Sequence, residues 1–148
     1  MDHTQTSLDT GVVVEALVRC AATKMGERAL ASAAPLTREA VVETYAAIDE
    51  WRALALEGGV PHLGGAEDVV DRVRGAAKGE ILDPAELIAV GRTLDVLQRA
   101  SAQLAEADEV PHLQDLAAPI HVDPWLKSEL EVAFEQDGRL SARRYPEL

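Results

Sequence analysis

The stretch DPAELIAVGRTLDVLQRASAQLAE, residues 83–106, carries the clearest structural signal in the chain. Asp83 can cap the start of a helix, Pro84 suits the first helical position, and the Glu86 side chain can reach back to the amide of the cap residue. Apolar residues then recur at helical spacing and form one stripe, Leu87, Val90, Leu94, Leu97 and Leu104. The pattern predicts a long helix that ends near Glu106.

Similar signals predict helices on the C-terminal side of this stretch. Pro111 begins a short helix that stops before Pro119, and Asp123-Pro124 repeats the pattern of a cap followed by proline. The last helix carries an apolar face made of Leu126, Leu130, Val132 and Phe134. Beyond it, Asp137-Gly138 is typical of a turn, and residues 139–148 are expected to be irregular or briefly extended.

Two threonines mark helix starts on the N-terminal side. Thr37 can cap a helix of about five turns that Gly58-Gly59 closes, and Thr23 can cap a shorter one. A first helix over residues 8–22 and another over 66–77 complete the set. Three of these helices carry residues at helical spacing, which are expected to lie on one face. They are Val13, Leu17, Val18 and Ala21 in the helix over 8–22, Val41, Tyr45, Ile48, Arg52 and Leu56 in the helix that Thr37 caps, and Val69, Val70, Val73 and Ala77 in the helix over 66–77.

These elements predict an all-α fold, a single domain of six or seven helices with at most short strand segments near 80–82 and 138–141. Residues 1–7 are polar and are expected to be a disordered lead-in, and no linker divides residues 8–148. A length of 148 residues suits one domain. The chain is 47% hydrophobic but only 3% aromatic, so its core must consist mainly of Ala, Leu, Val and Ile.

The chain is strongly acidic, because 14 Lys and Arg against 26 Asp and Glu give a formal charge of −12. We expect such a chain to be soluble and to repel polyanions, which argues against a nucleic-acid-binding module that works alone. Cys20 is the single cysteine, so no disulfide can form within the chain, and a cytoplasmic location is expected. The polar start and the early Glu15 predict neither a signal peptide nor a membrane anchor.

The sequence assigns no residue to catalysis, to cofactor binding or to metal binding. It lacks the phosphate-loop motif of nucleotide-binding proteins. Adjacent acids such as Glu67 and Asp68 are interpreted as solvated helix faces, and the glycines within 58–65 as turn formers rather than as an anion nest. The histidines match no zinc-ligand spacing and are interpreted as surface or loop residues: His3, His62, His112 and His121.

Other reactive or basic residues also receive structural interpretations. Cys20 is placed as a small buried hydrophobe rather than a nucleophile. Trp51 is placed in the core, whereas for Trp125 a core and an interface position stay open. Two groups of basic residues stand out. The first is expected to pair with neighbouring acids and consists of Arg72, Arg74 and Lys78. The second is expected to be a solvated tail and consists of Arg139, Arg143 and Arg144.

Two segments carry glycine, proline and acidic residues at spacings that agree together. They are Leu56-Glu57-Gly58-Gly59-Val60-Pro61 with Gly64-Gly65-x-x-Asp68, and Ala76-x-x-Gly79-x-Ile81-Leu82-x-Pro84-x-Glu86-Leu87. Flanking segments add Ala21-Ala22-Thr23-x-x-Gly26, Asp137-Gly138-x-Leu140 and Pro146-Glu147-Leu148. Together they resemble the N-terminal region of the type-two MutS family, bacterial paralogues of the mismatch-repair protein MutS that act as endonucleases and suppress recombination.

The resemblance implies that residues 8–148 are the helical core and lever region of a longer protein. Family members continue into clamp helices, a dimerising ATPase that uses ATP and Mg, and usually a nuclease domain, so the implied partners are DNA, a second subunit and, for some members, the ribosome. No catalytic residue of those parts corresponds to a position in this chain. The resemblance therefore implies a mechanical function, in which a non-catalytic domain couples the ATPase to the DNA clamp. A stand-alone helical adaptor that binds protein partners is the alternative, and an enzyme that uses scattered acids is the least favoured.

Overall fold

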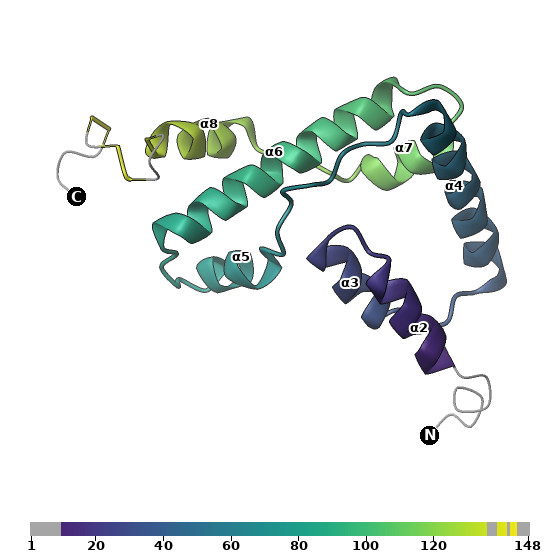
Figure 1. The fold of residues 1–148 in the computed structure, drawn as a ribbon. Coiled ribbons are helices and arrows are strands. Elements are labelled where there is room, and N and C mark those ends of the chain that lie inside the picture. Colours follow the sequence, from purple (N-terminus) through teal and green to yellow (C-terminus); the bar gives the residue numbers. More distant parts are fainter. Residues whose placement is uncertain (1–9, 136–138, 142, 145–148) are drawn as a thin grey trace.

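Seven helices make up the fold in the computed structural model, which describes residues 10–135, 139–141 and 143–144. They are α2 (Thr10–Arg19), α3 (Lys24–Ala31), α4 (Arg38–Glu57), α5 (Val70–Ala77), α6 (Pro84–Glu106), α7 (Pro111–Ala117) and α8 (Pro124–Ala133) (Figure 1). The predicted all-α single domain and the predicted number of helices are confirmed. The expected lead-in over 1–7 and the turn at Asp137-Gly138 lie outside the described residues.

The strand content of the described residues stays within the predicted limit of short segments. Residues 80–82 belong to no strand and instead connect α5 to α6. Near the C-terminus, Phe134 and Leu140 form an isolated antiparallel bridge within the part of the chain that is described. A single bridge cannot make a sheet, because a strand pair needs a ladder of hydrogen bonds and a covered face.

Helix α6 is the spine of the molecule (Figure 1). Its 23 residues extend over roughly 35 Å. Near its start, Ala89 and Val90 pack with Val69 in one small core, to which Leu130 of α8 adds a partly buried side chain. At its other end, Leu104 packs in a second core whose remaining buried members are Leu54, Val110, Leu113 and Ala117. The two cores are therefore separate clusters joined by one helix.

The start of α6 is a capping box, as predicted. The Glu86 N–H donates to Asp83 Oδ1 at 2.8 Å, and the Asp83 N–H donates to Glu86 Oε2 at 3.0 Å. Pro84 occupies the first turn, where its missing N–H costs nothing. The helix ends at Glu106, where the apolar pattern predicts its end.

The buried face of α6 differs in part from the predicted stripe. Val90 and Leu104 are buried, but Leu87, Leu94 and Leu97 are only half-buried. Small residues share the buried face, which comprises Ala89, Val90, Thr93, Val96, Ala100 and Leu104. Small side chains let a neighbouring backbone approach closely. The connection between α4 and α5 therefore packs on this face of α6.

Thr93 is the most deeply buried side chain among the described residues, at 1% exposure. Its hydroxyl accepts a hydrogen bond from the Glu67 N–H at 3.0 Å and lies 3.5 Å from the Glu67 carbonyl oxygen. The connection between α4 and α5 has few backbone partners of its own. The Thr93 hydroxyl therefore pairs with the Glu67 backbone and fixes this connection to the spine.

The predicted caps at Thr23 and Thr37 and the predicted closure at Gly58 are confirmed, whereas α2 ends at Arg19 rather than at residue 22 and α5 begins at Val70 rather than at residue 66. The Ala40 N–H donates to the Thr37 hydroxyl at 3.3 Å, and the Gly26 N–H donates to the Thr23 hydroxyl at 3.1 Å. Gly58 closes α4 with a φ of 75°, a left-handed conformation that favours glycine. These ends depend on residues close in sequence, which is why the sequence predicts them.

The pair α2 and α3 is attached to the rest of the molecule mainly by charge. Neither helix, both described in full, contains a buried residue. Arg28 Nε lies 2.9 Å from Asp68 Oδ2, and Arg28 Nη2 lies 2.7 Å from Asp71 Oδ2. The hydrogen bond from Arg28 and its charge hold the pKa of Asp71 below its ordinary value. Exposed ion pairs of this kind stabilise weakly, so α2 and α3 form the least firmly packed part of the fold.

Several residues expected to face inward are exposed instead. In each case the neighbouring element covers only one side of the helix, and the remaining apolar positions face solvent. The corrected residues are Val13 and Leu17 in α2, Val41, Tyr45, Ile48 and Leu56 in α4, Val73 and Ala77 in α5, and Leu126 and Val132 in α8.

The capping box provides a direct test of how α6 is held. Asp83→Ala should lower the free energy of unfolding by about 1 kcal/mol, because the Glu86 N–H loses its acceptor at the helix start. Asp83→Asn keeps an acceptor oxygen and should cost only a fraction of that amount. Urea unfolding followed by circular dichroism measures both. Equal losses for the two variants would contradict the assigned role of the Asp83 side chain.

Candidate functional site

An open groove with a mainly apolar lining lies between α4 and α7. Its volume is about 800 Å³. Ala47 of α4 and Leu113 of α7 form its floor, and Ile48, Trp51 and Leu116 form its walls. Ile48 is 46% exposed and Leu116 is 68% exposed. The groove therefore presents apolar side chains that no described element of the chain covers.

Glu50 sets the position of α7 against α4. Its carboxylate accepts the His112 N–H at 3.2 Å and the Leu113 N–H at 2.9 Å, and its Oε1 lies 2.5 Å from His112 Nδ1. Val110 precedes α7 and supplies no side-chain cap, so Glu50 caps this helix from another part of the chain. Removal of the carboxylate from water acts to raise its pKa. The hydrogen bonds from the His112 ring and the two backbone N–H groups outweigh that effect, so the pKa of Glu50 lies below its ordinary value.

Charges around the groove are mainly negative. Glu43 of α4 and Asp115 of α7 line it, and neither has a hydrogen-bond or ion-pair partner among the residues that the structure describes. The one Arg that lines the groove, Arg52, lies 3.5 Å from Asp49 Oδ1. The groove thus combines an apolar floor with two carboxylates that are free to meet a cation.

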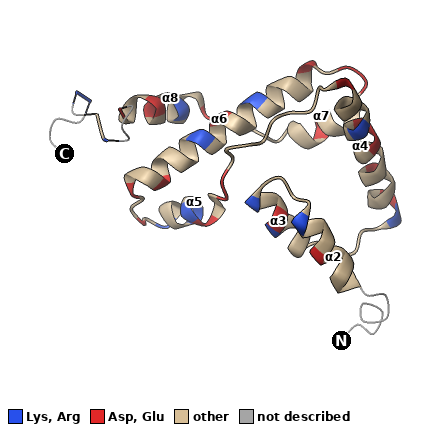
Figure 2. Ribbon diagram, in the orientation of Figure 1, with Lys and Arg blue, Asp and Glu red and all other residues tan. Residues whose placement is uncertain are grey.

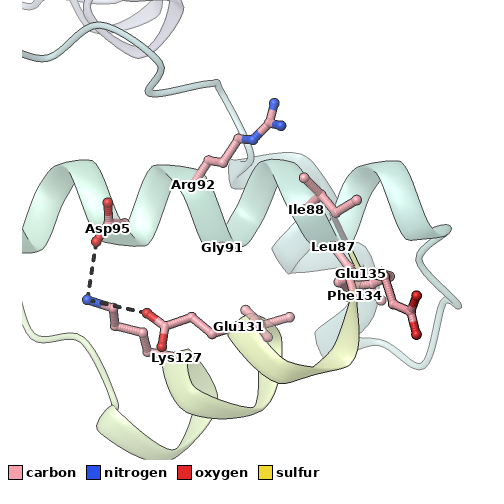
Figure 3. Close-up of a pocket in the computed structure, with 10 residues that line it drawn as sticks. Leu87, Ile88, Gly91, Arg92, Asp95, Lys127, Glu131, Phe134 and Glu135 are labelled. Atoms are coloured by element: carbon pink, nitrogen blue, oxygen red, sulfur yellow. Dashed lines mark hydrogen bonds and ion pairs between the residues drawn. The ribbon is translucent and has the colours of Figure 1, made fainter. Parts of the chain in front are cut away.

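A second cleft, of about 530 Å³, lies where α8 crosses α6 (Figure 3). Lys127 Nζ reaches across it, 3.2 Å from Asp95 Oδ1 and 2.6 Å from Gln98 Oε1, and lies 3.8 Å from Glu131 Oε1 on its own helix. Leu130 packs beside Gly91 at the same crossing. Lys127 and Asp95 join the two helices across this cleft, so we interpret it as the seam that docks α8.

Among the residues that the structure describes, the histidines and the paired acids form no combined site. His62 and His121 are exposed, His112 is bound to Glu50, and His3 lies outside the described residues. In the described part of the chain, no three His, Cys, Asp or Glu side chains are grouped so that they could hold a metal ion. Asp68 is engaged by Arg28 rather than free as a solvated acid, which corrects its interpretation.

The positions of the cysteine and one tryptophan also differ from the prediction. Cys20 is exposed, not buried, because it follows the end of α2 and no further element covers it. Trp51 is 37% exposed and lines the groove rather than the core. Trp125, for which two positions stay open in the sequence, is 70% exposed on α8.

Basic and acidic residues are scattered over the helices, as Figure 2 shows. Arg72 lies 3.5 Å from Glu67 and 3.6 Å from Glu86, and Arg74 lies 3.9 Å from Asp71, so the expected pairing of this group is confirmed for both arginines. Lys78, the third member, is exposed. In the second group, Arg143 and Arg144 are both exposed, as expected of a solvated tail. Arg144 Nη2 also lies 2.7 Å from Glu129 Oε1 of α8, so this arginine has an acidic partner.

None of the helices in the described chain combines the length and apolar character that crossing a membrane would need.

Fold and surface together define a helical domain with one spine, two small cores and broad uncovered apolar faces. Three relatives named Endonuclease MutS2 align with it over almost its whole length. The protein from Anaeromyxobacter sp. (strain Fw109-5) is 35% identical over 153 aligned residues, covering 99% of this chain and 18% of the relative. The relative from Symbiobacterium thermophilum is 28% identical, and the alignment covers 99% of this chain and 19% of the relative. The relative from Pelotomaculum thermopropionicum is 27% identical, and the alignment covers 92% of this chain and 18% of the relative.

The resemblance to the type-two MutS family is thereby confirmed, and the chain is homologous to a region of the MutS2 endonucleases. It spans about a fifth of the length of these relatives. No family model and no solved structure matches the chain.

The Glu50 cap generates a pH-dependent prediction. Because the pKa of Glu50 is lower in the folded than in the unfolded chain, the carboxylate stabilises the fold above its unfolded pKa, and this contribution is lost as the pH falls through the folded pKa. Glu50→Gln should therefore reduce the urea midpoint at about pH 7, and its difference from the wild type should shrink at about pH 3.5. Glu43→Gln on the same helix is the control and should leave the midpoint unchanged. A Glu50→Gln deficit that is the same at both pH values would contradict the role of the charge.

The exposed thiol generates a second prediction. Cys20 should react fully with a thiol-specific disulfide reagent in the absence of denaturant, at a rate within about threefold of the rate in urea, because no described element covers it. The absorbance of the released chromophore measures the reaction. A thiol that becomes reactive only after unfolding would show that the region around α2 packs differently.

Proposed function

We propose that this chain is a non-catalytic structural domain of a MutS2-like, DNA-binding, ATP-dependent endonuclease that suppresses homologous recombination. In this role the domain couples the ATPase of the longer protein to its DNA clamp. In this proposal the longer protein binds ATP and Mg and forms a homodimer. It acts on DNA or, in a variant of this role, on the ribosome. The observation that carries the proposal is the alignment of nearly the whole chain with a fifth of proteins named as endonucleases.

Uncovered apolar surface supports this role. The chain has an accessible surface of 11381 Å², whereas a compact monomer of its mass exposes roughly 7,400 Å². Large apolar side chains contribute to this surface on most helices, including Val12, Val13, Val42, Tyr45, Ile48, Leu116, Trp125 and Val132. Large exposed apolar patches are typical of surfaces that other protein segments cover. A domain inside a longer protein needs such faces for its neighbours.

The arrangement of the helices supports a mechanical role. Movement of packed helices as rigid bodies is a common way to transmit a change between distant sites. Helix α6 joins the core around Val90 to the core around Leu104, so a displacement at one end is carried to the other. In this proposal α6 transmits the displacement, and the exposed apolar faces attach the domain to neighbouring parts that move.

Charge supports contact with DNA through other parts of the longer protein. The chain has a formal charge of −12, and its Arg72 and Arg74 side chains already have acidic partners. Phosphate contacts depend on available Lys and Arg side chains. We therefore expect the chain alone to bind DNA weakly.

The groove between α4 and α7 also suits the alternative function, a stand-alone adaptor that binds protein partners. Trp51 and Leu116 line it, and exposed Trp side chains are frequent anchors of protein interfaces. The two functions share one fold. They differ in whether the domain works as part of a longer protein or on its own.

A domain exchange tests the proposed function. The homologous region of the Anaeromyxobacter MutS2 endonuclease is replaced by this chain, and ATP hydrolysis is measured with and without branched DNA. The exchanged protein should keep the DNA dependence of the parent within about threefold, whereas a version with an unrelated helical bundle should lose it. An adaptor function predicts that both replacements fail equally, and this result would contradict the coupling role.

The isolated chain provides a second test. Titration with branched DNA at about 50 mM and about 200 mM salt should reveal weak binding or none, and ATP should not be hydrolysed. Tight binding that falls steeply with salt would contradict the charge argument. ATP turnover by the isolated chain would contradict its assignment as non-catalytic.

A further inference from the structure

We infer that the groove between α4 and α7 binds an amphipathic helix that carries Lys or Arg beside its apolar face. This inference deepens the proposed function, because it names the chemistry of the segment that covers one exposed face. It rests on that proposal for the presence of such a segment in the longer protein. Three features of the groove support it: its shape, the spacing of its apolar residues and its charge.

The shape of the groove fits an elongated ligand. It is bounded by α4 on one side and α7 on the other and is open to solvent, so a ligand can lie along it without entering the core. Residues from Ala40 to Arg52 of α4 line it, a distance of roughly 18 Å along the helix axis. This length corresponds to about three turns of a second helix.

Val41 and Tyr45 do not line the groove, but they continue the apolar surface of α4 beside Ile48, which does line it. Val41, Tyr45 and Ile48 are separated by four and three residues, so they lie on one face of the helix. Tyr45 is 65% exposed and Val41 is 36% exposed. In helix-in-groove recognition the bound helix carries the regularly spaced apolar anchors, and an apolar stripe along the groove gives them a surface to pack against. The stripe is longer than a small apolar ligand requires, which favours a helix as the occupant.

The charge of the groove selects the sign of its partner. Glu43 and Asp115 line the groove from its two helices, and neither has a partner among the described residues. Arg52, the cation that lines the groove, is already next to Asp49. Complementary charges at the edge of an interface favour the correct partner and penalise partners of like charge. An acidic helix would place its own carboxylates beside these two, so a basic helix is favoured.

Binding of two synthetic peptides tests the inference. The first is an amphipathic helix of about 18 residues built from Leu and Lys, with Leu on one face, and the second has the same composition in scrambled order. Titration calorimetry measures their affinity for the full chain. The patterned peptide should bind about tenfold more tightly than the scrambled one.

Variants locate the binding. Ile48→Ser with Leu116→Ser should weaken binding of the patterned peptide about tenfold, whereas Ile81→Ser, a change at a side chain 97% exposed elsewhere, should not. Glu43→Lys with Asp115→Lys should also weaken it about tenfold. Glu106→Lys with Asp108→Lys changes the net charge by the same amount away from the groove and should alter affinity by less than about twofold. Circular dichroism verifies that each variant is folded.

Three results would overturn the inference. Equal affinity of the two peptides would show that the groove does not select a helix. Equal weakening by both pairs of charge reversals would show that only net charge attracts the peptide. Self-association of the chain that Ile48→Ser with Leu116→Ser abolishes would identify a second copy as the occupant. The domain exchange reports separately on the proposed function, because it measures DNA-dependent ATP hydrolysis and not peptide selection.

Discussion

The packing of two separate cores on one helix is the constraint on which the rest of this structure depends. Helix α6 supplies Ala89 and Val90 to one core and Leu104 to the other. Thr93, between them, fixes the returning chain to the same helix. Because each core is small, neither can cover the outer faces of the helices that surround it. The spine therefore gives the domain its length and leaves its apolar faces uncovered.

Charged contacts between distant parts of the chain replace much of the missing apolar packing. Glu50 caps α7 from α4, and Arg28 joins α3 to Asp68 and Asp71. Such contacts define orientation more than they add stability, since partly exposed charges remain screened by water. The domain is thus organised as a spine with attached helices, an arrangement that suits attachment to neighbouring parts of a larger protein.

Helix boundaries marked by a local cap could be predicted from the sequence, but uncapped boundaries such as the start of α5 and the burial of side chains could not. The capping box at Asp83 and the left-handed Gly58 depend on residues within a few positions, so their signals are local. Whether Ile48 is covered depends instead on which helix lies beside α4, and periodicity alone cannot give that answer. The contact between Glu50 and His112 joins residues 62 positions apart, and no spacing rule indicates it. The groove was missed for the same reason, because its two walls come from different helices.

Hydrogen–deuterium exchange tests most directly whether the exposed faces serve as attachment surfaces. The exchange of backbone amides is compared between this chain alone and the same chain placed in the Anaeromyxobacter MutS2 endonuclease. The account expects amides of α4 and α7 to exchange at least about tenfold more slowly in the larger protein, while those at the centre of α6 remain unchanged. Equal exchange of α4 and α7 in the two settings would show that these faces remain uncovered and would contradict the account.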